Sequence, residues 1–187
     1  MNQIHRWLCR SHRWRKKIGP RMSWVLEGLE LGPDVLEVGP GPGLTTDRLR
    51  RDARYVTAVE IDPVLAESLT RRLRGSNVTV VRGDASSLSF EDAKFSAAVS
   101  FTMLHHVPSR ELQDKILREI CRVLKPGGLF AGADSLPSFR RASGTSLLSP
   151  PIRPSAFGRA TLCSSLDRRH CRDNPLALSS AASRRFA

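Results

Sequence analysis

The sequence predicts an α/β domain with a doubly wound parallel sheet, in which helices cover both faces of the strands. Short segments rich in apolar and β-branched residues alternate with segments whose apolar residues recur at helical spacing. The strand segments have few polar interruptions, which is typical of a sheet buried on both faces. The first segment runs into a glycine-rich turn, V-L-E-V-G-P-G-P-G at residues 35–43, and a helical pattern follows.

Five strands are expected, each bounded by turn residues or by a change of pattern. In chain order they are Asp34–Val38, Tyr55–Ile61, Val78–Val81, Phe95–Phe101 and Leu129–Ala133. Because parallel strands are joined by right-handed crossovers, this order places the intervening helices with little freedom.

The predicted helices lie between these strands and before the first one. Apolar residues after Pro20 predict a helix that covers part of the domain, and another helix follows the glycine turn. Pro63 suits a helix start, with apolar residues at helical spacing until Gly75. The strongest amphipathic pattern covers residues 112–124, and Pro126-Gly127-Gly128 is expected to end that helix and turn the chain into the last strand.

The net charge of +12 lies at the two ends of the chain. Residues 1–24 hold seven Lys or Arg and no acid, residues 137–187 hold nine Arg and two Asp, and residues 25–136 hold 14 basic and 16 acidic residues. Because the middle is nearly neutral, its charge does not favour a nucleic-acid partner. Trp7 and Trp14 among the N-terminal arginines favour peripheral contact with an anionic membrane, with a solvated arm and a targeting peptide as alternatives.

Three regions are expected: a basic helical segment at residues 1–30, a central domain at 31–136, and a Ser/Arg/Pro-rich tail at 137–187 whose composition predicts disorder. The four cysteines include no C-x-x-C pair, so neither a disulfide framework nor a metal site is expected, although Cys163, His170 and Cys171 can be read as metal ligands. No apolar run reaches the length of a membrane span, and the N-terminus lacks the apolar core of a secretory signal, so a cytoplasmic location is expected.

The polar residues suited to ligand binding fall at the carboxyl ends of the predicted strands, the edge at which open α/β sheets bind ligands. The glycines after the first strand let backbone N–H groups approach a nucleotide closely, because no Cβ is in the way. Glu60 ends the second strand, where a carboxylate can accept hydrogen bonds from both hydroxyls of a ribose. Asp84 follows the third strand, within reach of an adenine amino group, and Asp134 follows the fifth.

Five sequence blocks resemble the class I S-adenosylmethionine-dependent methyltransferases of the methyltransferase type 11 family. The blocks are V-L-E-V-G-P-G-P-G (35–43), V-T-A-V-E-I-D-P (56–63), R-G-D-A-S-S-L-S-F (82–90), F-S-A-A-V-S-F-T-M-L-H-H-V (95–107) and V-L-K-P-G-G-L-F (123–130). The resemblance implies a Rossmann-like fold, S-adenosyl-L-methionine as the cofactor, and methyl transfer to an acceptor, with a small molecule or lipid favoured over nucleic acid.

The same resemblance implies a role for each residue at the carboxyl edge. The residues that surround the methionine portion of the cofactor are Glu37, Gly39, Gly41 and Gly43. Glu60 holds the ribose, Asp84 and the backbone of Ala85 read the adenine ring, and Phe101 and Thr102 line the sulfonium site. His105 and His106 are the candidates for a general base, which methyl transfer needs only when the acceptor must lose a proton.

Each role has a plainer alternative, and so does the function. The glycines can simply permit a tight turn, Glu60 can be a solvated acid, Asp84 can cap the turn after it, and the two histidines can support the cleft. One alternative function is an NAD-dependent oxidoreductase, although that class predicts Gly-x-Gly-x-x-Gly and this turn reads Gly-x-Gly-x-Gly. The other is a degenerate, non-catalytic domain that binds the cofactor weakly or acts only through its basic ends.

Members of the resembling family continue after the fifth strand with a helix and two further strands. Residues 137–187 show no such pattern, so the sheet is expected to lack its usual last two strands. The C-terminal part of the domain is therefore expected to be missing or read out of frame.

Overall fold

The computed structural model describes residues 12–134, and residues 1–11 and 135–187 lie outside that range. The expectations for the start of the basic segment, for the Ser/Arg/Pro-rich tail and for Cys163, His170 and Cys171 concern residues outside it. Within residues 12–134, no helix combines the length and hydropathy that crossing a bilayer requires.

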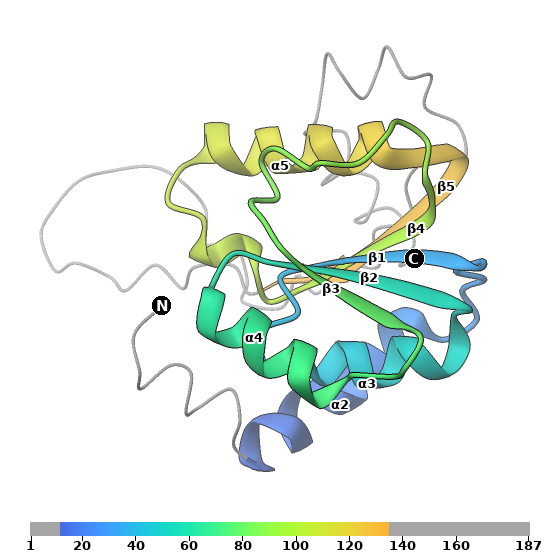
Figure 1. Cartoon of the computed structure of the whole chain (residues 1–187), viewed down its shortest axis with the longest axis vertical. Coiled ribbons are helices and arrows are strands. Elements are labelled where there is room, and N and C mark those ends of the chain that lie inside the picture. The colour runs from blue at the N-terminus through green and yellow to red at the C-terminus, as the bar shows by residue number, and fades with distance from the viewer. Residues whose placement is uncertain (1–11, 135–187) are drawn as a thin grey trace, which may run out of the picture.

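Five parallel strands form one sheet in the order β3-β2-β1-β4-β5, which confirms the predicted fold class (Figure 1). The strands are β1 (Asp34–Val38), β2 (Tyr55–Glu60), β3 (Val78–Arg82), β4 (Phe95–Phe101) and β5 (Leu124–Ala133). From β1 the chain moves outward through β2 to β3, then returns to place β4 on the other side of β1. The strand order therefore reverses between β1 and β4, the point at which open α/β sheets bind ligands.

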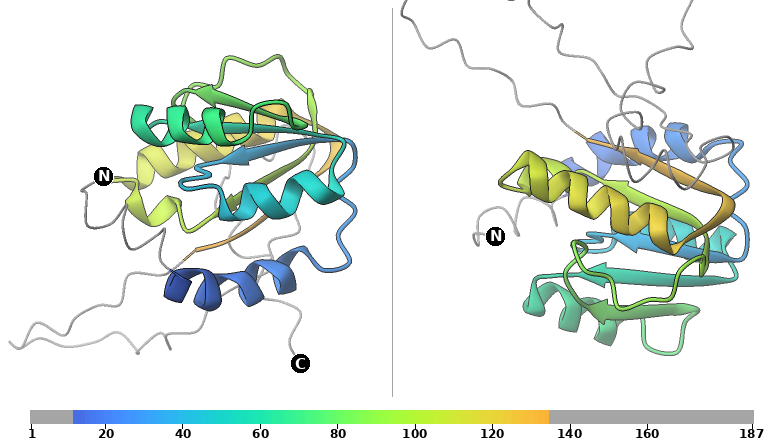
Figure 2. Two further views of the ribbon diagram at one scale, coloured as in Figure 1. Left: turned by 60° about the horizontal axis from the view of Figure 1, so that its bottom comes forward. Right: turned by 90° about the horizontal axis from the view of Figure 1, so that it is seen from above.

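Helices lie on both faces of this sheet (Figures 1 and 2). On one face are α2 (His12–Leu26), α3 (Leu44–Asp52) and α4 (Pro63–Arg72), and on the other is α5 (Arg110–Val123). Successive side chains of a strand point to opposite faces, so Val35 packs in the apolar cluster with α2 and α3, whereas Leu36 packs in the cluster with α5. A short 3₁₀ turn, η1 (Leu104–His106), joins β4 to α5.

The crossover from β3 to β4 is a loop that one arginine ties to α5. Arg122 on α5 donates to the carbonyl oxygens of Leu88 (2.8 Å) and Phe90 (2.7 Å) and pairs with Asp92 at 2.8 Å. Leu88 is buried, and Phe90 meets Phe95 edge-on with ring centroids 5.2 Å apart. The loop therefore joins the same apolar cluster as α5.

The first difference from the sequence prediction concerns the N-terminal helix. It begins at His12, so Pro20 lies inside α2 and does not precede the helix. A proline removes one backbone hydrogen bond of a helix. The buried side chains of Met22, Val25 and Leu26 hold α2 on the sheet, and this packing outweighs the lost bond.

The second difference concerns Pro126-Gly127-Gly128, which lies inside β5 and does not end α5. Helix α5 ends at Val123, and the next residue, Leu124, already pairs with Phe95 before the register shifts. A Cβ at Gly128 would lie 2.8 Å from the carbonyl oxygen of Lys125 and 3.1 Å from that of Ser96. The glycine therefore permits an irregular, bulged start of β5.

Candidate functional site

A cavity of about 420 Å³ opens at the carboxyl ends of β1, β2, β3 and β4. The predicted site residues that line it are Gly39, Gly41, Glu60, Asp84, Ala85, Phe101, Thr102, His105 and His106. Two further predicted residues, Glu37 and Gly43, are buried and lie outside its lining. The volume falls within the range of small-molecule sites.

A second hollow, of about 990 Å³, lies at the opposite end of the strands. It is bounded by α2, by the segment that leads into β1, and by Arg54 just before β2. It contains none of the predicted site residues, and sheets of this type bind ligands at the carboxyl ends of their strands. We therefore assign the functional site to the smaller cavity.

The glycine turn after β1 forms one wall of the cavity, and its backbone requires glycine. Gly39, Gly41 and Gly43 have φ angles of +70°, +54° and +83°, all in the left-handed region. A Cβ at Gly39 would lie 3.0 Å from the Cβ of Met103, whereas one at Gly41 would meet no atom within 4 Å. The backbone at Gly41 is therefore open to close approach by a ligand.

Glu60, at the end of β2, fixes the turn and presents a carboxylate beside it. Its Oε2 accepts a hydrogen bond from the backbone N–H of Gly41 and its Oε1 from that of Asp62, both at 2.9 Å. Glu60 is only 5% exposed, and this burial raises the pKa of its carboxyl group, while hydrogen bonds from nearby backbone N–H groups, those of Asp62 and Gly41 foremost, offset part of the rise. Each oxygen keeps a second acceptor position, so the carboxylate can accept two further hydrogen bonds from a ligand.

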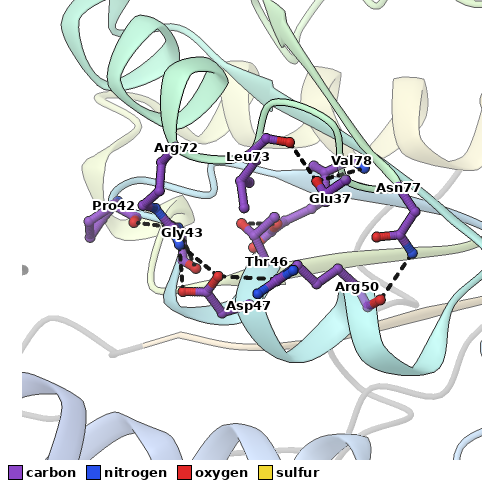
Figure 3. Close-up of polar contacts among 11 residues, drawn as sticks. Glu37, Pro42, Gly43, Thr46, Asp47, Arg50, Arg72, Leu73, Asn77 and Val78 are labelled. Atoms are coloured by element: carbon purple, nitrogen blue, oxygen red, sulfur yellow. Dashed lines mark hydrogen bonds and ion pairs between the residues drawn. The ribbon is translucent and has the colours of Figure 1, made fainter.

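Glu37, on β1, is a buried acid whose contacts face α3 (Figure 3). The hydroxyl of Thr46 donates to its Oε2 at 2.6 Å. Burial raises the pKa of Glu37 to about 8, although the Thr46 hydrogen bond acts in the opposite direction. This rise favours the protonated form of the carboxyl group, which can donate a hydrogen bond as well as accept one.

Arg72, at the end of α4, supports the glycine turn through contacts that the sequence pattern does not indicate (Figure 3). Its Nη1 contacts both carboxylate oxygens of Asp47, at 2.7 and 2.8 Å, and its Nη2 donates to the carbonyl oxygens of Pro42 and Gly43, at 3.2 and 3.3 Å. One guanidinium group thereby ties α4 to the turn and to the first turn of α3.

Asp84 and Ala85 follow β3 and line the cavity. The Oδ1 of Asp84 accepts a hydrogen bond from the backbone N–H of Ser86 at 2.8 Å, so Asp84 caps the turn that follows it. This cap uses one oxygen of an exposed carboxylate, and it is compatible with a ligand contact at the other oxygen.

The chain turns sharply where it leaves β4 at the cavity. Thr102 has a φ angle of +50°, a left-handed conformation that costs a non-glycine residue about 1–2 kcal/mol. Its N–H donates to the carbonyl oxygen of Ala133 at 2.8 Å, which links this turn to the end of β5. Strained residues of this kind persist where the surrounding structure imposes them, often at functional sites.

His105 lies on η1, lines the cavity and forms a close pair with Asp134 at the end of β5. The distance from His105 Nδ1 to Asp134 Oδ1 is 2.5 Å, and the two side chains are 25% and 23% exposed. The ring centroid of His106, which also lines the cavity, lies 3.9 Å from that of His105. The sequence places Asp134 at the carboxyl edge, but only the fold shows that its partner is His105.

The sequence is similar to known methyltransferases. Residues 36–132, which contain the predicted site residues from Glu37 to His106 but not Asp134, match the profile of a family described as a methyltransferase domain. A ubiquinone biosynthesis O-methyltransferase of Xanthomonas oryzae pv. oryzae is 31% identical over 144 residues, covering 68% of this chain and 58% of that protein. An rRNA adenine N-6-methyltransferase of Saccharopolyspora erythraea is 52% identical over 63 residues, covering 32% of this chain and 16% of that protein.

Several solved structures are similar in both fold and sequence, and one of them is described as a methyltransferase. An S-adenosylmethionine-dependent methyltransferase from Methanosarcina mazei is 27% identical with a TM-score of 0.52, covering 56% of this chain and 53% of that one. The chain thus corresponds to between 16% and 58% of the length of the two curated relatives described above.

Proposed function

The chain belongs to the S-adenosylmethionine-dependent methyltransferases of the methyltransferase domain family, and on that basis we propose that its cavity holds S-adenosylmethionine and that it methylates a small acceptor. The observation that carries the proposal is the contact between Gly41 and Glu60. Through it, an open stretch of backbone and a buried carboxylate lie side by side in one cavity.

The residues present fit this cofactor. A ribose carries two neighbouring hydroxyl groups, and the acceptor positions left on the two oxygens of Glu60 suit them. The turn around Gly41 has room for the methionine portion, with Glu37 and Gly43 buried beside it. In this proposal Asp84 and Ala85 read the adenine ring, and Phe101 and Thr102 line the sulfonium site.

The bound cofactor supplies a methyl group on a positively charged sulfur, which a nucleophile can displace directly. The protein has to orient the acceptor toward that group and to exclude water. Apolar side chains that flank η1 or lie on α5 line the cavity and favour an acceptor with an apolar body: Met103, Val107, Leu112 and Ile116.

A small molecule or the polar end of a lipid is the acceptor that we propose. The ubiquinone relative aligns with 68% of this chain, whereas rRNA methyltransferase relatives align with 31% to 50% of it. The nearly neutral charge of residues 25–136 also offers little attraction for a phosphate backbone. RNA is the alternative acceptor, and it is included in the experiments below.

Calorimetric titration with S-adenosylhomocysteine and with NAD tests the cofactor assignment. We expect the first ligand to bind and the second not to bind. Glu60→Gln should weaken S-adenosylhomocysteine binding by about tenfold or more, because the amide nitrogen turns one acceptor into a donor that faces a backbone N–H.

The matched control is Glu67→Gln, which changes an exposed acid on α4 whose partner Arg71 is 4.0 Å away. This variant should bind S-adenosylhomocysteine as the wild type does. Folded protein that binds neither ligand would support the degenerate domain, and binding of NAD alone would support the oxidoreductase.

A further inference from the structure

Asp134 contacts both the imidazole ring of His105 and the backbone of η1. Its Oδ1 meets Nδ1 of His105 at 2.5 Å, and its Oδ2 accepts hydrogen bonds from the backbone N–H groups of Leu104 at 2.6 Å and His105 at 3.3 Å. From the other side, Nε2 of Gln113 on α5 donates to the carbonyl oxygen of Leu104 at 3.0 Å. Strand β5 and helix α5 together therefore fix the position of His105 at the cavity.

The contact with Asp134 also determines which nitrogen of His105 is available for chemistry. An ionised carboxylate only accepts hydrogen bonds, so the ring nitrogen beside it, Nδ1, carries the proton. In the neutral ring, Nε2 then has a free lone pair.

We propose that His105 is the general base that deprotonates an acceptor hydroxyl, that Asp134 positions it, and that this site therefore methylates a phenol-type hydroxyl group. The inference rests on the function proposed above. Nε2 of His105 takes the hydroxyl proton and the acceptor oxygen forms a bond to the methyl carbon. The bond from that carbon to sulfur breaks, and its electron pair stays on the sulfur.

The pair of His105 and Asp134 suits a hydroxyl acceptor better than an amino acceptor. A neutral phenol is a poor nucleophile, so a base that removes its proton during transfer lowers the barrier directly. An adenine amino group attacks as the neutral amine and releases its proton afterwards. The apolar side chains of Met103, Leu112 and Ile116 in the same cavity suit an aromatic ring.

Two phenols of different acidity test the role of His105. Catechol is largely un-ionised at mildly alkaline pH, whereas 4-nitrocatechol is largely ionised and does not need a base. We expect His105→Gln to lower kcat with catechol by about 100-fold or more and to have a much smaller effect with 4-nitrocatechol. Asp134→Asn should give the same pattern with a smaller loss, because the ring remains but its orientation and tautomer are no longer fixed.

Asp52→Asn is the control, since it removes an exposed carboxylate that pairs with Arg48 on α3, and it should leave both rates unchanged. Each variant is also titrated with S-adenosylhomocysteine and melted thermally. If Asp134→Asn does not fold, His105→Gln carries the test alone.

Equal losses with both phenols would show that His105 only supports the structure, and the inference would be wrong. It would also be wrong if wild-type protein that binds S-adenosylhomocysteine methylated neither phenol, whether or not it methylated an adenine-containing RNA oligonucleotide. Failure to bind S-adenosylhomocysteine would instead reject the proposed function.

Discussion

Gly39→Ala should destabilise the protein more than Gly41→Ala, although the two glycines share the same local setting. Each has a positive φ angle and each precedes a proline, so an alanine at either position adopts a left-handed conformation that costs about 1–2 kcal/mol. Only at Gly39 does the new Cβ also meet Met103, whose Cβ would lie 3.0 Å away. Displacing a packed side chain adds about 1–3 kcal/mol, and this is the expected difference between the variants.

Urea unfolding followed by circular dichroism measures that difference. Replacing Met103 with alanine in the Gly39→Ala background should recover part of the lost stability, because the longer part of the obstructing side chain is gone. The ligand affinities should show the reverse order: Gly41→Ala places a methyl group in open space on the cavity wall and should weaken S-adenosylhomocysteine binding. Equal unfolding free energies for the two single variants would refute the reasoning, since Met103 would then yield without cost.

Two further predictions concern the residues around the turn. Burial raises the pKa of Glu37 from its ordinary value of 4.5 to about 8, so the native state keeps a proton that the unfolded chain releases. The stability of the wild type should therefore fall as the pH rises between these two values. Urea unfolding over a pH series measures this fall, and the Glu37→Gln variant should not show it. Arg72→Lys should weaken S-adenosylhomocysteine binding severalfold in calorimetry, because an ammonium group cannot contact Asp47 and the carbonyl oxygens of both Pro42 and Gly43 together. The control is Arg71→Lys at the exposed neighbouring position, which should have no effect. Equal effects of the two substitutions would argue against this role of Arg72.

Local patterns were sufficient to predict most of the fold. The strand Asp34–Val38 was predicted with its observed bounds, and so was the start of α4 at Pro63; the structure adds that Asp62 caps this helix by accepting hydrogen bonds from its first N–H groups. Pro20 and Gly128 were misinterpreted, because a proline is usually excluded from the interior of a helix and a Pro-Gly-Gly run usually ends one. Burial of α2 and pairing of β5 with β4 outweigh those local preferences.

The part of the site that lies at the carboxyl ends of the strands could be predicted, because the parallel topology brings these ends together at one edge of the sheet. Glu60 and Asp84 line one cavity for that reason. The alternation of side chains along β1 places Glu37 on the same face as Val35, toward α3, which explains why it is buried beside Thr46 and does not line the cavity.

Contacts between distant segments were beyond sequence reasoning. Arg72 and Asp47 are 25 residues apart, and His105 and Asp134 are 29 residues apart. Each pair meets only because separate elements dock on the same sheet. No spacing rule within one helix or strand indicates either contact.

Because the chain returns across β1 after β3, the residues proposed to recognise the nucleoside lie in an earlier part of the sequence than the elements on the other side of the cavity. The groups proposed to recognise the nucleoside all precede residue 86, while η1, α5 and the end of β5 follow it. Substituting the cavity-lining residues that follow Thr102, such as Val107, Leu112 and Ile116, should therefore change which compound is modified and leave recognition of the donor intact. Divergence among relatives in what they modify is expected to concentrate there.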